Sequence, residues 1–87
     1  MKIDHIAIYV ENLEATKEFF IKYFNATANN LYHNPKTGLS TYFLSFEGNT
    51  RLELMTRTNI AKTEFILYRQ GLIHLSFSLG NKKKLMN

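Results

Sequence analysis

Apolar and polar residues alternate along the first stretch of the chain, residues 3–10, IDHIAIYV. Ile6, Ile8 and Val10 fall on one face, and His5 falls on the other. A period of two is typical of a β-strand with one buried face. We therefore predict a strand here, with an imidazole on the face opposite the core.

The period changes in the next segment, where apolar residues recur at helical spacing. Asn12 is suited to begin a helix as its N-cap, and Asn25 can take the left-handed conformation that ends one. The spacing predicts a helix at about 13–24, with an apolar stripe formed by Leu13, Phe19, Phe20, Tyr23 and Phe24. We interpret this stripe as core packing.

Three more strands are predicted before residue 57. Residues 27–33 form a weak strand, which the turn NPKTG at 34–38 ends. Residues 39–46, LSTYFLSF, are rich in aromatic residues and form a strong strand. The short turn EGN then leads into 50–56, TRLELMT, which pairs with that strand as a hairpin.

A further strand is predicted at 72–79, LIHLSFSL. It resembles the strand at 3–10: His74 aligns with His5, and an apolar residue follows each histidine. We therefore predict that the strand at 72–79 begins a second copy of the first module. The predicted fold class is α+β: a βαβββ module at 1–56, a linker at 57–71, and the first strand of an incomplete second module within 72–87.

Three predicted strands carry a metal-binding residue type opposite their apolar face: His5, Glu53 and His74. Two imidazoles and one carboxylate are suitable ligands for zinc, nickel, manganese, iron or cobalt as divalent ions. A bound metal could act there as a Lewis acid. Each residue alone is more typical of a hydrogen-bonded or solvated strand position, so the prediction depends on all three sharing one surface. His33 lies beside a turn and receives no role.

Composition narrows the class of protein. The chain has 87 residues, a net charge of +4 and no cysteine. The absence of thiols fits a reducing cytoplasm, where we expect the protein to reside. The positive charge is scattered apart from Lys82, Lys83 and Lys84, so nucleic-acid binding is not predicted. No apolar run is long enough to cross a membrane, and no membrane partner is expected.

The order of these motifs resembles the vicinal oxygen chelate superfamily, the glyoxalase, bleomycin-resistance and extradiol-dioxygenase group. The resemblance covers IDHIAIYVENLEATKEFFIKYFNA, RLELM and GLIHLSFSL. It implies paired βαβββ modules that enclose a metal site, with His5, Glu53 and His74 in ligand positions. It also implies a final-strand glutamate, often active in proton transfer, that is not found within these 87 residues.

The resemblance is compatible with three functions. The first is a metal-dependent lyase or isomerase, similar to lactoylglutathione lyase, that acts on a small substrate with vicinal oxygens and has Glu53 as its catalytic carboxylate. The second is a metal-free protein that sequesters a ligand, as in the bleomycin-resistance type. The third is a shortened, inactive chain.

Further expectations concern the ligand face and assembly. Candidate wall residues are Tyr9, Tyr42, Phe46 and Met55; of these, Tyr9 and Met55 share the face of the metal ligands. Because one module has an open sheet edge, we expect a homodimer, with the strand at 72–79 as a candidate for exchange between copies.

Overall fold

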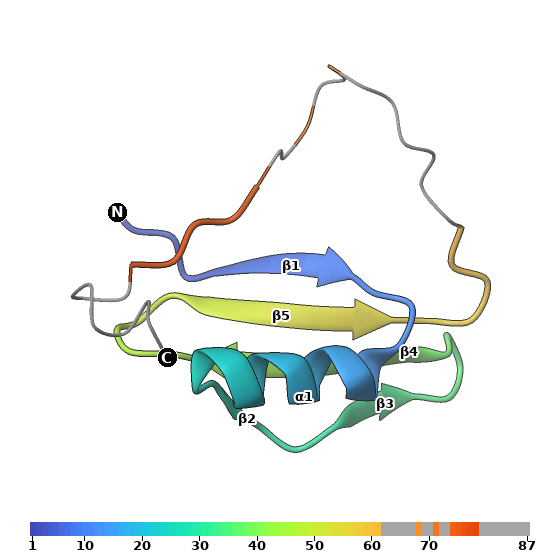
Figure 1. Ribbon diagram of the computed structural model, residues 1–87. Helices are drawn as coiled ribbons and strands as arrows, with labels where there is room; N and C mark the ends of the chain where they lie inside the picture. The colour runs from blue at the N-terminus through green and yellow to red at the C-terminus, as the bar shows by residue number, and fades with distance from the viewer. Residues whose placement is uncertain (62–67, 69–70, 72–73, 79–87) are drawn as a thin grey trace.

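One mixed sheet and one helix make up the regular structure in the computed structural model, which describes residues 1–61, 68, 71 and 74–78 (Figure 1). The fold is α+β, as predicted. The elements in chain order are β1 (His5–Tyr9), α1 (Leu13–Phe24), β2 (Thr27–Ala28), β3 (Tyr32–Asn34), β4 (Leu39–Ser45) and β5 (Arg51–Thr56).

The helix begins and ends at the two asparagines that the sequence indicated. The side chain of Asn12 accepts a hydrogen bond from the Ala15 N–H at 3.0 Å, which satisfies one of the free donors of the first turn. Asn25 takes the left-handed conformation with φ of 56°, and the Ala26 N–H donates to the Phe20 carbonyl at 3.2 Å. The predicted range of 13–24 is therefore confirmed.

The strand order places β1 at one edge of the sheet. The order is β1-β5-β4-β2, and β3 also pairs with β4. β1 runs parallel to β5, whereas the other pairs are antiparallel. Helix α1 covers one face of the sheet, and the described residues leave most of the other face uncovered (Figure 1). We call the uncovered side the open face.

The core lies between α1 and the sheet. Leu44 on β4 and Leu54 on β5 are fully buried, and Leu52 is nearly so. Ile6 and Ile8 on β1 pack against the same cluster, as their alternation predicted. The odd-numbered positions of β1, β4 and β5, among them those of His5 and Glu53, consequently face away from the helix.

The weak strand predicted at 27–33 is divided into β2 and β3. Between them, the side chain of Asn29 accepts a hydrogen bond from the Phe43 N–H at 2.8 Å. The Asn29 N–H still donates to the Phe43 carbonyl at 3.2 Å, but the return bond goes to a side-chain oxygen in place of a backbone carbonyl, so the regular ladder is interrupted there. The sequence showed the asparagines but did not indicate which of them would bond to the sheet.

The strand predicted at 72–79 is not formed over its described part, residues 74–78. Its alternation persists, because Leu75 and Phe77 are partly buried whereas His74 is exposed. Phe77 lies 4.6 Å from Phe24 between ring centroids, and Leu75 packs against the core. Side-chain packing therefore holds the segment, without the paired strand edge that a β-strand requires.

The remaining predicted boundaries fall largely outside the described residues. Most of the linker at 57–71, and of the module portion at 72–87, lies there. Among the residues that are described, no helix is both long and apolar enough to cross a membrane.

Candidate metal centre

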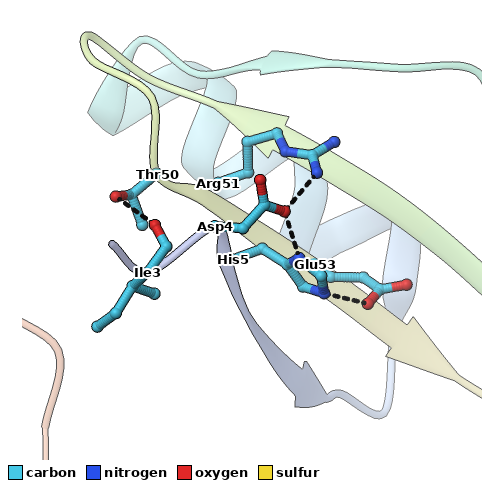
Figure 2. Close-up of polar contacts among 6 residues, drawn as sticks. All are labelled: Ile3, Asp4, His5, Thr50, Arg51 and Glu53. Carbon is cyan, nitrogen blue, oxygen red and sulfur yellow. Dashed lines mark hydrogen bonds and ion pairs between the residues drawn. The ribbon is translucent and has the colours of Figure 1, made fainter. Parts of the chain in front are cut away.

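His5 and Glu53 lie side by side on the open face (Figure 2). In the parallel register of β1 and β5, Ala7 is opposite Glu53, so His5 is the diagonal neighbour of the carboxylate. The Nε2 atom of His5 is 3.7 Å from Oε1 of Glu53. Ala7 presents only a methyl group beside Glu53.

The other ring nitrogen of His5 is held by the preceding residue. Nδ1 lies 2.8 Å from Oδ2 of Asp4, and the same oxygen accepts a hydrogen bond from the Arg51 guanidinium at 2.8 Å (Figure 2). The hydrogen bond with His5, and then that with Arg51, hold the pKa of Asp4 below its usual value. An ionised carboxylate can only accept, so Nδ1 is the ring nitrogen that carries a proton.

Two hydrogen bonds to backbone carbonyls hold the residues before β1 against the start of β5. The Arg51 N–H donates to the Asp4 carbonyl at 3.0 Å, and the Thr50 hydroxyl donates to the Ile3 carbonyl at 3.2 Å (Figure 2). They extend the pairing of β1 and β5 beyond the first residue of β1. The relative position of Asp4 and Arg51 is therefore set by the sheet.

Phe43 on β4 forms an aromatic wall next to this pair. Its ring lies edge-to-face with His5 at a centroid distance of 5.2 Å, and the Arg51 guanidinium lies 4.4 Å from the ring centre. Phe43 is directly opposite Glu53 in the β4–β5 register. The site thus has an apolar side in addition to its charged groups.

The arrangement suits a cation between His5 and Glu53. In its Nδ1–H form, His5 would turn the lone pair of Nε2 toward the nearby carboxylate oxygen of Glu53. A separation of 3.7 Å is shorter than two metal–ligand bonds of about 2.0–2.2 Å laid end to end, so both atoms can reach one metal ion. The two residues therefore fit as ligands of a divalent metal.

His74 does not join them in this structure. His74 is exposed, and its neighbour Leu75 packs against the core beneath α1, whereas His5 and Glu53 lie on the open face. Over the part of the chain that the structure describes, no group of three or more His, Cys, Asp or Glu side chains is placed to hold a metal ion. The pair supplies two ligands, and the role of His74 stays a prediction.

Two of the four predicted wall residues belong to the other side of the sheet. Tyr9 and Met55 are neighbours in the β1–β5 register and share the open face with Glu53. Tyr42 is buried beneath α1, where its hydroxyl bonds to Glu14, and Phe46 packs against Phe20. Phe43 is opposite Glu53 in the β4–β5 hairpin and therefore shares its face, so pairing the two strands residue by residue would have identified Phe43 as a wall residue instead.

Sequence reasoning also missed Asp4 and Arg51. The sequence contained an indication of both, because an acid directly precedes His5 and Arg51 lies two residues before Glu53, hence on its face. What it lacked was the parallel register that brings Arg51 opposite His5.

Solved structures show the same arrangement of elements. One is hypothetical protein BH1468 from Bacillus halodurans C-125, 25% identical, with a TM-score of 0.56 over 64% of this chain and 40% of that chain. Another is SMU.1112c, 22% identical, with a TM-score of 0.77 over 99% of this chain and 73% of that chain. This chain therefore spans less than half of BH1468. No curated protein matches significantly.

The fold is a mixed sheet with one helix on one face, which is consistent with a glyoxalase-type module. Residues 2–85 match the Glyoxalase/Bleomycin resistance protein/Dioxygenase superfamily, and the chain belongs to it.

Proposed function

We propose that the protein is a metal-dependent lyase or isomerase of the glyoxalase type, acting on a small substrate with vicinal oxygens at the open face. The observation that carries this proposal is the separation of 3.7 Å between His5 Nε2 and Glu53 Oε1, two candidate ligand atoms on adjacent strands. His5 and Glu53 would supply two metal ligands, and His74 is the proposed third. Family membership supports the same class of chemistry.

The residues of this chain have separate tasks in the proposal. A bound divalent metal would supply Lewis acidity toward the substrate oxygens. Phe43, Tyr9 and Met55 would pack against the carbon skeleton of the substrate, and the small side chain of Ala7 leaves room for it. The carboxylate of Glu53, only 16% exposed, would be close enough to the substrate to accept a proton.

We further propose that two copies form the complete site. β1 is an edge strand whose outer side has no partner among the described elements, and such edges readily pair. Tyr9 and Tyr32, on the open face, are 55% and 53% exposed, which leaves apolar surface for a partner to cover. His74 lies on a segment whose described residues are held by side-chain packing, and a second copy could receive it.

A metal titration tests the proposal. Purified protein, freed of metal and titrated with zinc or nickel in a calorimeter, should bind the metal. His5→Ala and Glu53→Gln should each weaken binding at least about 100-fold, because each removes a direct metal ligand. His33→Ala is the matched control: His33 is exposed and hydrogen-bonded to Ser40, so its loss should leave the affinity unchanged.

Two results would contradict the metal proposal. One is the absence of binding by the unmodified protein, and the other is an equal loss in the His33 variant. The metal-free binding function would then be favoured, since the aromatic and thioether side chains of the open face could bind a ligand without a metal.

A further inference from the structure

Asp4 and Arg51 are not part of the proposed metal-binding pair, but Asp4 contacts His5 and Arg51 contacts Asp4. Oδ2 of Asp4 receives two donors at 2.8 Å each, His5 Nδ1 and the Arg51 guanidinium. Arg51 is itself held over the Phe43 ring, which contacts the edge of His5. Asp4, Arg51, Phe43 and His5 itself thus form a closed ring of contacts.

The position of Asp4 matters because its side chain is 70% exposed. An exposed carboxylate beside a single histidine would exchange its partner readily with water. Here the backbone pairing of Asp4 with Arg51 brings the guanidinium to the same oxygen, and Phe43 restrains the guanidinium from one side. The carboxylate therefore has a fixed direction despite its exposure.

We propose that Asp4, held by Arg51, is a positioning residue that fixes His5 as its Nδ1–H tautomer and aims Nε2 at Glu53. Which nitrogen of an imidazole is free for a ligand is set by the hydrogen bond of the other nitrogen. The inference rests on the proposed function for its purpose, but the tautomer is a property of the metal-free protein and can be measured without it.

The test is nitrogen NMR of metal-free protein at about pH 8.5, where histidine side chains are neutral. The chemical shifts of the imidazole nitrogens, and their couplings to the ring protons, report which ring nitrogen carries the proton. The His5 signals are assigned as those that disappear in His5→Ala. The unmodified protein should show His5 as the Nδ1–H form. Asp4→Ala should convert it mainly to the Nε2–H form, which free imidazole side chains prefer in water, and Asp4→Asn should give a mixture.

The matched control is Glu18→Gln, which removes one exposed carboxylate on α1 away from this site. It should leave the His5 tautomer unchanged. In a parallel zinc titration, Asp4→Ala should lower the affinity about 10–100-fold, as is typical when the carboxylate partner of a ligand histidine is removed. Circular dichroism should show the same helix content in all variants.

An Nε2–H tautomer in the unmodified protein, or an unchanged tautomer in Asp4→Ala, would overturn the inference. The two measurements test the positioning role of Asp4 and the proposed metal-dependent function separately. A tautomer that shifts as predicted in a protein that binds no metal supports the positioning role and contradicts the metal-dependent activity. Metal binding with no tautomer response does the opposite.

Discussion

Tyr42 is the residue that makes a polar link between the sheet and the helix. Its hydroxyl donates to Oε2 of Glu14 at 2.5 Å, and Lys17 lies 3.1 Å from the other carboxylate oxygen and over the Tyr42 ring. The hydrogen bond raises the pKa of Tyr42 and lowers that of Glu14. The contact therefore favours an ionised Glu14 in the folded protein.

Tyr42→Phe should lower the melting temperature by roughly 4–8 °C at neutral pH, because it removes a charge-assisted hydrogen bond from a small domain. Tyr32→Phe is the control, since Tyr32 is exposed and should tolerate the change. Thermal unfolding followed by circular dichroism checks both variants.

The difference between Tyr42→Phe and the unmodified protein should depend on pH. Because the folded pKa of Glu14 is depressed, its contribution is fully present above the ordinary value of 4.5 and is lost as pH falls through the lower folded pKa. The two melting temperatures should therefore converge below pH 4.5. A gap that stays constant at lower pH would contradict this role of Glu14.

Single residues show what the sequence could predict of the site. His5 and Glu53 were found because alternation alone assigns each of them to the face opposite a buried neighbour, and the structure brings them together. Asp4 and Arg51 were missed because their meeting depends on a parallel pairing between residues 47 positions apart. No local pattern encodes that register.

The same distinction holds for whole elements. Helix α1 and the hairpin of β4 and β5 follow from local features, namely two asparagine caps and a short turn between alternating strands. The split of residues 27–33 depends on the pairing of Asn29 with Phe43 through a side-chain oxygen, and the packing of 74–78 depends on aromatic rings of α1. Both features depend on tertiary contacts. The local pattern does not reveal such contacts, so it predicted one continuous strand in each place.

On the scale of the whole molecule, the packing of the sheet is one-sided over the described residues. Its helix side is packed, but its open face and the outer side of β1 have no partner among the described elements. Light scattering at dilute concentration should therefore give twice the chain mass of 10.2 kDa. A stable species at the single-chain mass would contradict the homodimer.

The most direct measurement of the central claim is the position of the metal. Crystals of the zinc-loaded protein, measured on both sides of the zinc absorption edge, should show an anomalous peak within about 2.0–2.2 Å of both His5 Nε2 and Glu53. If the dimer completes the site, the partner's His74 should be the third ligand. A peak at His33 or elsewhere, with His5 and Glu53 free of metal, would contradict the account.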